Sequence, residues 1–210
     1  MSRGLFVTLE GIEGAGKSTV AQLIGAWLAR LGIPVRLTRE PGGTPLAERV
    51  RQIALGRHEE PLTPLTETLL MFAARSLHVR GVIAPALASG TWVVCDRFTD
   101  ATRAYQGSGR GVDAALIEAL ARAVHPGLAP DCTLLLDLPV EMGLARARAR
   151  ADARADRFES ETAAFFEKVR AGYLALAHAE PGRFRVIDAA APLAAVEARV
   201  AEILAGLASP

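Results

Sequence analysis

The sequence predicts a single α/β domain built on a mostly parallel sheet. Segments with strand character and segments with helical periodicity alternate along the chain, and no linker or internal repeat separates them. The chain has 210 residues, of which 50% are hydrophobic, and this fits one globular domain with a full core. Ligands of parallel sheets bind beyond the carboxyl ends of the strands, so residues that follow strands are the first functional candidates.

Short apolar runs are expected to form the strands of this sheet, and they cover residues 5–9, 35–38, 92–95, 133–137 and 184–187. Apolar residues at spacings of three and four predict helices over about 17–31, 46–55, 65–88, 114–124, 160–179 and 193–207. Pro85 is expected to kink the third of these helices near its end. Residues 106–111 are rich in glycine and are expected to form a loop.

Composition and charge exclude several classes of protein. The 24 Lys and Arg residues nearly balance the 23 Asp and Glu residues, so we expect neither a nucleic-acid partner nor a membrane surface. No apolar run approaches the roughly 18 residues of a membrane span, and the N-terminus lacks the long apolar core of a signal peptide. Two cysteines are too few for a disulfide framework, and a cytoplasmic location is expected. The absence of asparagine excludes GTPases that read guanine with Asn-Lys-x-Asp.

Residues 11–18 match the phosphate-loop pattern G-x-x-x-x-G-K-[ST] and lie between a predicted strand and a predicted helix. Glycines let backbone N–H groups surround phosphate oxygens, and the positive end of the helix dipole adds to their effect. Lys17 would reach the β- and γ-phosphates, and the Ser18 hydroxyl would bind Mg²⁺. A glycine-rich turn is the alternative, but only two of the 24 basic residues are lysines. The pattern predicts a nucleoside-triphosphate site formed by Gly11, Ile12, Glu13, Gly14, Ala15, Gly16, Lys17, Ser18 and Thr19.

Polar residues after the second and third predicted strands indicate a further phosphate site. Asp96 and Arg97 directly follow the third strand, where the carboxylate would help to hold Mg²⁺ and the guanidinium would bind a second phosphate group. Arg39 follows the second strand in the same way, and Arg51 lies about one helix length further on. A capping aspartate with solvated arginines is the alternative interpretation.

Six stretches resemble the bacterial thymidylate kinase family, in the family's order and over nearly the whole chain: residues 8–19, 38–43, 96–98, 104–110, 156–159 and 186–189. The phosphate loop is common to many families, whereas Arg-Glu-Pro-Gly-Gly, Asp-Arg and Ala-Tyr-Gln-Gly are much more specific. The resemblance implies an α/β fold of the P-loop nucleoside-monophosphate-kinase type, with a five-stranded sheet flanked by helices, and one domain over residues 1–210. It also implies a homodimer that transfers the γ-phosphate of ATP to dTMP with Mg²⁺ as cofactor, giving dTDP and ADP for dTTP synthesis.

The resemblance also implies roles for individual residues. Lys17 and Arg97 are expected to be catalytic, Glu13 to accept a hydrogen bond from the 3′-hydroxyl, and Tyr105 to crowd a 2′-hydroxyl. The residues expected to bind dTMP are Glu13, Arg39, Glu40, Pro41, Arg51, Phe72, Arg75, Arg97, Thr102, Tyr105 and Gln106.

Two residues are candidates for stacking on the thymine base. Phe72 over thymine with Arg75 on a base carbonyl is the prediction, because the two lie on one helical face. Met71 stands at the position four residues before Arg75, where several relatives have phenylalanine. A buried apolar stripe over residues 69–72 is the alternative.

Residues 142–157 are rich in arginine and are expected to form a lid over the phosphates, at Arg146, Arg148, Arg150, Arg154 and Arg157. An arginine at the transferring phosphoryl group is worth about 10³–10⁵ in rate. The phosphate loop contains no arginine, so the sequence resembles the class that supplies the catalytic arginine from the lid, with Arg150 and Arg154 as candidates. A solvated basic face is the alternative.

Two other functions remain open at this point. One is a kinase for another nucleoside monophosphate or a deoxynucleoside, and a panel of acceptors separates it from the first. The other is a nucleotide-binding switch that hydrolyses ATP slowly and ignores every monophosphate. The many arginines expected on the acceptor side disfavour a switch, since a switch needs only one phosphate site.

Overall fold

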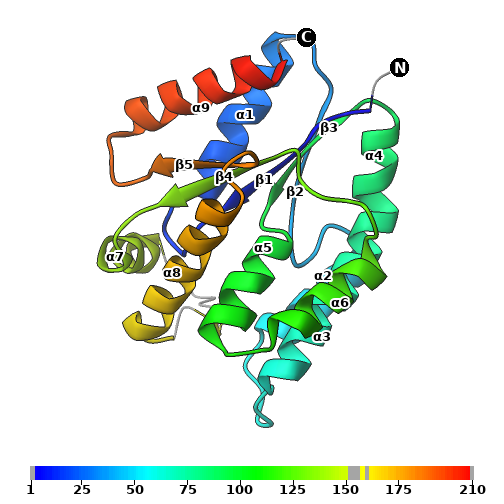
Figure 1. Ribbon diagram of the computed structural model, residues 1–210, viewed down its shortest axis with the longest axis vertical. Coiled ribbons are helices and arrows are strands. Elements are labelled where there is room, and N and C mark those ends of the chain that lie inside the picture. The colour runs from blue at the N-terminus through cyan, green and yellow to red at the C-terminus, as the bar shows by residue number, and fades with distance from the viewer. Residues whose placement is uncertain (1–2, 151–156, 159–160, 209–210) are drawn as a thin grey trace.

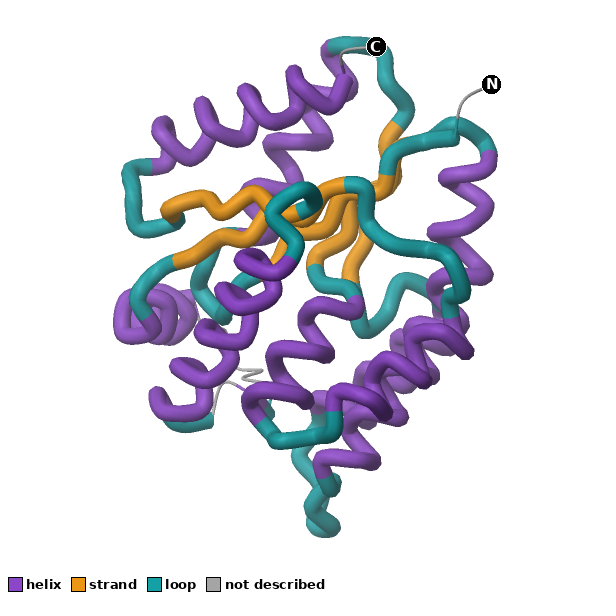
Figure 2. The backbone as a smooth tube through the Cα atoms, viewed as in Figure 1, coloured by secondary structure: helices purple, strands orange, loops and turns teal. Residues whose placement is uncertain are grey.

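The computed structural model describes residues 3–150, 157–158 and 161–208, and it confirms the α/β prediction. Five parallel strands form one sheet in the order β2-β3-β1-β4-β5, between layers of helices (Figures 1 and 2). The strands are β1 (Phe6–Glu10), β2 (Val35–Arg39), β3 (Trp92–Asp96), β4 (Cys132–Asp137) and β5 (Phe184–Asp188). The central strand β1 is buried along its whole length, including its two polar residues, Thr8 and Glu10.

Most helices lie where the spacing of apolar residues predicts them, whereas those at Thr99–Thr102 and Val140–Arg150 fall outside the predicted helical ranges. The helices are α1 (Lys17–Arg30), α2 (Pro45–Leu55), α3 (Pro64–His78), α4 (Ala84–Ala88), α5 (Thr99–Thr102), α6 (Ala114–Val124), α7 (Val140–Arg150), α8 (Ala163–Ala179) and α9 (Leu193–Ala208). Side chains cap several of their N-termini: Thr44 caps α2, Asp113 caps α6 and Thr162 caps α8. Within the described ranges, no helix is long and apolar enough to cross a membrane.

Helices cover both faces of the sheet and also gather beyond one of its ends. Helices α1 and α9 pack on one face, while α5 and α8 lie on the other (Figure 1). Helices α2, α3 and α6 gather beyond the carboxyl ends of β2 and β3, away from α9 (Figure 1). Helices α2, α3 and α6 therefore form a second group, which faces the loop that follows β1.

Two segments differ from the sequence prediction. The predicted helix 65–88 is helical throughout, but it consists of α3, a π-helical segment η1 (Val79–Ile83) and α4, and η1 ends shortly before Pro85. The predicted loop 106–111 is wrong over most of its length, because Arg103–Gly109 forms a second π-helical segment, η2, directly after α5.

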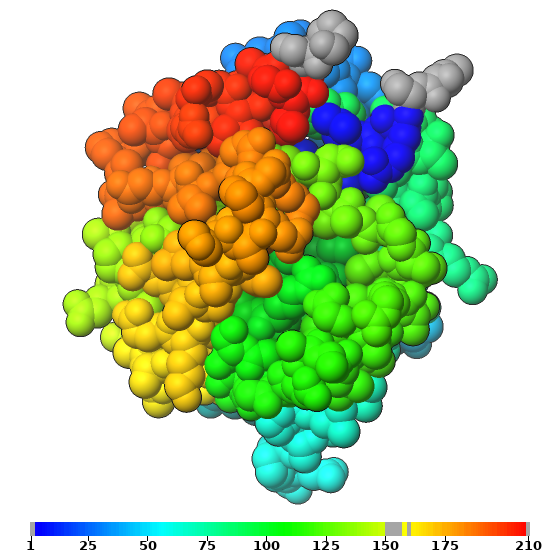
Figure 3. All heavy atoms as spheres, viewed as in Figure 1, coloured from blue at the N-terminus to red at the C-terminus, as the bar shows by residue number. Residues whose placement is uncertain are grey.

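Tight packing accounts for the helical form of η2. It lies along α8, and Figure 3 shows the two segments in contact, η2 in green and α8 in yellow to orange. A Cβ at Gly109 would stand 2.6 Å from the Phe165 ring, so glycine is needed for this approach. Burial against α8 thus overrides the low helix propensity of glycine.

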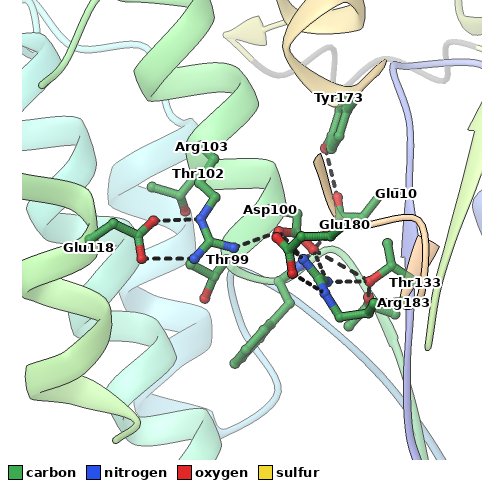
Figure 4. Close-up of polar contacts among 12 residues, drawn as sticks. Glu10, Thr99, Asp100, Thr102, Arg103, Glu118, Thr133, Tyr173, Glu180 and Arg183 are labelled. Carbon is green, nitrogen blue, oxygen red and sulfur yellow. Dashed lines mark hydrogen bonds and ion pairs between the residues drawn. The ribbon is translucent and has the colours of Figure 1, made fainter. Parts of the chain in front are cut away.

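A buried polar cluster fixes α5 and η2 to the rest of the domain (Figure 4). Asp100 is 1% exposed and accepts hydrogen bonds from Arg103 at 2.8 Å and from Arg183, which precedes β5, at 2.6 Å. Arg103 also donates to Glu118 of α6 at 2.7 Å. The segment that carries Tyr105 and its neighbours is therefore held from both sides.

Candidate active site

The carboxyl ends of β1, β2 and β3 open into one cavity of about 460 Å³. Most of the residues predicted from the sequence line it: Glu13, Gly14, Gly16, Lys17, Ser18, Arg39, Glu40, Pro41, Arg51, Arg75, Asp96, Arg97, Thr102, Tyr105 and Gln106. The remaining members of the phosphate loop, Gly11, Ile12, Ala15 and Thr19, shape the loop without lining the cavity. The structure thus brings together residues that are up to about ninety positions apart in the chain.

The phosphate loop is built around its lysine. Lys17 Nζ donates to the carbonyl oxygens of Gly11 at 3.0 Å and Ile12 at 2.9 Å, and the side chain is buried. Burial and the nearby Arg97 lower the pKa of Lys17 to about 8. Gly14 has a φ of 74°, and a Cβ there would collide with the carbonyl oxygen of Gly143 in α7. The loop is therefore seated firmly on the helix that begins the predicted lid.

The expected metal ligands, Ser18 and Asp96, lie side by side and both line the cavity. The Ser18 hydroxyl donates to the Asp96 carboxylate at 3.4 Å. Among the described residues, no group of three or more His, Cys, Asp or Glu side chains could hold a metal ion by itself. One hydroxyl and one carboxylate fit Mg²⁺, which takes few protein ligands and completes its shell with water and substrate phosphates.

Arg97 joins three elements at the centre of the site. Its guanidinium donates to Glu13 Oε1 at 2.9 Å, to the Tyr105 hydroxyl at 2.9 Å and to the Tyr173 hydroxyl at 3.2 Å. The Tyr105 hydroxyl in turn donates to Glu13 Oε2 at 2.6 Å. Arg97 has a φ of 71°, which is uncommon for a residue other than glycine, and strained backbone of this kind clusters at functional sites.

Two residues behind Arg97 were not predicted from the sequence. Glu10, the last residue of β1, accepts hydrogen bonds from the Phe98 N–H at 2.8 Å and from the Tyr173 hydroxyl at 2.7 Å (Figure 4). Burial, followed by the charge of Asp100, raises the pKa of Glu10 to about 8. Tyr173 lies on α8, more than 70 residues from Arg97, and no local pattern marks it.

Two more arginines extend the cationic lining towards α2. Arg39 makes a double hydrogen bond with Glu48, at 2.7 and 3.1 Å. Arg51 donates to the carbonyl oxygen of Pro41 at 2.9 Å. Both side chains line the cavity, so the geometry supports the acceptor-phosphate prediction for this region.

The far end of the cavity holds a buried ion pair. Arg75, 3% exposed, donates from Nε to Glu40 at 2.7 Å and from Nη2 to Thr102 at 3.1 Å. Glu40 also accepts a hydrogen bond from His78 Nδ1 at 3.0 Å. The other amino group of Arg75, Nη1, is buried and has no hydrogen-bond partner within the part of the chain that the structure describes. A buried donor left in this way at a cavity points to a ligand acceptor.

The structure separates the two candidates for base stacking. Met71 lines the cavity, whereas Phe72 does not. Phe72 packs with Ile117 and Ala121 of α6, and the Arg75 guanidinium stacks on its ring at 4.7 Å. The aromatic residue therefore supports Arg75 from behind, and the apolar contact on the cavity side comes from the methionine.

Only part of the predicted lid lies within the described residues. Arg150, as a side chain, and Arg154 lie outside them. Arg146 donates to the carbonyl oxygen of Ala189 at 2.8 Å. Arg157 donates to Ala54 at 3.0 Å, and its neighbour Phe158 lines the cavity.

This fold and cavity define a P-loop protein of the nucleoside-monophosphate-kinase type. The sequence model of the thymidylate kinase family matches residues 9–200. The chain is 57% identical to the thymidylate kinase of Alkalilimnicola ehrlichii, over 98% of this chain and 94% of the relative. It is 56% identical to that of Pseudomonas entomophila, over 97% and 96%. The crystal structure of thymidylate kinase from Ehrlichia chaffeensis superimposes with a TM-score of 0.77 at 33% identity, covering 96% of this chain and 99% of that one.

The chain belongs to the thymidylate kinase family. The family and the fold that the sequence motifs implied are thereby confirmed.

The pKa of Lys17 predicts how ATP binding depends on pH. Below pH 8 the ammonium is charged and attracts the triphosphate, while above pH 8 the free protein holds a neutral amine that must first take up a proton. The affinity for a non-hydrolysable Mg-ATP analogue, measured by calorimetry from about pH 6.5 to about pH 9.5, should be flat at first and then fall by up to about tenfold per pH unit. Lys17→Arg, which stays charged, should lose this fall. A flat wild-type profile would show that Lys17 does not titrate here.

Proposed function

We propose that this protein transfers the γ-phosphate of ATP to dTMP, giving dTDP and ADP. Membership of the family supports this, and one observation carries it: Arg75, whose buried Nη1 has no hydrogen-bond partner among the described residues, lines the same cavity as the phosphate loop. A phosphate donor and a base acceptor would thus share one enclosed space. Phosphoryl transfer needs positioning and charge neutralisation rather than covalent catalysis, and the residues described above provide both.

The donor half of the reaction rests on the phosphate loop. The α1 N-terminus and Lys17 would hold the β- and γ-phosphates, with Lys17 exchanging its carbonyl partners for phosphate oxygens. Ser18 and Asp96 would hold Mg²⁺, which when bound neutralises charge on the phosphates. Removal of the metal with EDTA is expected to abolish turnover.

The acceptor half rests on residues that other side chains already hold in place. Arg97, with Arg39 and Arg51, would bind the dTMP phosphate and bring it in line with the donor. Glu13 would accept from the 3′-hydroxyl, and the Tyr105 ring would crowd a 2′-hydroxyl. Arg150 and Arg154 remain the predicted source of the catalytic lid arginine, and the homodimer also remains a prediction.

The far end of the cavity, around Arg75, is called the base end here, and its chemistry favours a thymine-like ring. Arg75 Nη1 supplies a donor for a base carbonyl, Thr102 and Gln106 lie beside it, and Met71 supplies an apolar contact. A nucleotide-binding switch would have no use for this second polar end. This end of the cavity therefore favours a dTMP kinase over a nucleotide-binding switch.

An ADP-release assay with Mg-ATP and each of dTMP, dUMP, UMP, dCMP, AMP and GMP tests the proposal. We expect strong turnover with dTMP, weaker turnover with dUMP and negligible turnover with the ribonucleotides. Equal rates with several monophosphates would leave a kinase without thymine specificity. Slow release that ignores every acceptor would contradict the proposal and favour the switch.

Substitutions at the two neighbouring positions of α3 test the assignment of the base contact. Met71→Ala should raise the KM for dTMP by about tenfold and leave the KM for ATP unchanged, because it removes apolar contact with the base. Phe72→Ala should lower the free energy of unfolding by about 3–5 kcal/mol, since the ring is 2% exposed and packed in a cluster. Kinetics and urea denaturation of both variants distinguish the roles. The reverse pattern would return the stacking role to Phe72.

A further inference from the structure

A buried carboxylate of α3, which the mechanism above does not use, lies next to the base end of the cavity. Glu67 is 1% exposed. Its Oε1 accepts from Gln106 Nε2 at 2.6 Å, and its Oε2 accepts from Arg157 Nη2 at 2.6 Å. Arg110 Nη2 stands 3.6 Å from the same carboxylate. Two separate parts of the chain, η2 with the residue that follows it and residue 157, therefore meet α3 at one acidic side chain.

The chemistry of this contact fixes the orientation of the Gln106 amide. An ionised carboxylate only accepts hydrogen bonds, whereas an amide has a donating NH₂ and an accepting oxygen. The opposite orientation would place two oxygen acceptors 2.6 Å apart. Glu67 therefore keeps the NH₂ of Gln106 turned towards itself.

The fixed amide leaves its oxygen available to a ligand. Gln106 lines the cavity, and its Oε1 has no hydrogen bond to the described part of the chain. Arg75 lines the same cavity, and its buried Nη1 is a donor without a hydrogen-bond partner in the described part of the chain. A donor beside an acceptor matches a base that carries a carbonyl next to an N–H, as thymine and uracil do. Cytosine presents the opposite pattern, an amino group next to an unprotonated nitrogen.

We propose that Glu67 is a positioning residue that sets the choice of base by fixing the Gln106 amide. This inference rests on the proposed function, because it concerns the recognition of dTMP in the same cavity. Glu67 touches no substrate itself. It lies four residues before Met71 and eight before Arg75, on the face of α3 that is turned to the site.

Glu67→Gln should reverse the orientation of the amide. Arg157 offers only donors, so the new side chain must turn its oxygen to Arg157 and its NH₂ to Gln106. Gln106 must then accept with its oxygen and present its NH₂ to the cavity, opposite the N–H of thymine. We expect the kcat/KM for dTMP to fall by at least about tenfold, and dCMP to become a better competitor relative to dTMP by a similar factor. The KM for ATP should not change.

Two matched variants isolate the role of the amide. Glu161→Gln makes the same chemical change in a neighbouring carboxylate, which accepts from Arg110 at 2.6 Å but not from Gln106. It should leave the preference for dTMP over dCMP within about twofold of wild type. In a Gln106→Leu background, Glu67→Gln should likewise change that preference by less than about twofold, because no amide remains to be turned.

The proposal is overturned if folded Glu67→Gln keeps the wild-type preference, or if the loss persists in the Gln106→Leu background. Should Glu67→Gln fail to fold, Glu67→Gln/Arg157→Met is compared with Arg157→Met, since removing both partners leaves no unpaired buried charge. In the double variant the amide of Gln106 is free to turn either way, and the preference for dTMP over dCMP should again fall relative to Arg157→Met. An unchanged preference would overturn the proposal. Wild-type protein without activity on dTMP would overturn the proposed function and this inference with it, whereas the results above overturn the inference alone.

Discussion

The geometry of the site depends on the guanidinium of Arg97. It ties the phosphate loop, through Glu13, to η2, through Tyr105, and to α8, through Tyr173. These elements come from distant parts of the sequence and would otherwise be free to shift relative to one another. Burying such a charge is costly unless it is paired and hydrogen-bonded, so the surrounding carboxylate and hydroxyl groups are a condition for its position.

The same principle extends over the rest of the cavity. Arg75 is held in a buried ion pair by Glu40, whereas the pair of Arg39 with Glu48 is accessible to solvent, with 47% of the Arg39 side chain exposed. Arg97 and Arg75 are therefore oriented before a substrate arrives, and little of their reorganisation remains to be done when a ligand binds. The carboxylates also reduce the positive charge of the empty cavity, so that the folded protein tolerates several arginines close together.

Sequence patterns could predict the parts of this site that are local. The phosphate loop, Asp96–Arg97 and Arg39–Glu40 lie at the carboxyl ends of strands, and parallel strands bring these ends to one edge. Tyr173 could not be found in this way, because its contact with Arg97 depends on how α8 packs against η2. Gly109 contributed to the wrong prediction of a loop, because it is used here for its missing side chain, which allows close packing against α8. Glu67 did leave a signal, a spacing of four and eight from Met71 and Arg75, but helical spacing alone does not tell a buried carboxylate from a solvated one.

The most direct test of this account is the kinetic effect of Arg97→Lys. Lysine keeps the charge but cannot bond Glu13, Tyr105, Tyr173 and a phosphate from one planar group. The account predicts a loss of about 10²-fold or more in kcat/KM for dTMP, with a KM for ATP close to that of wild type. A variant that retains kcat/KM within about threefold would show that a single positive charge is enough, and it would contradict the central place given to the guanidinium network.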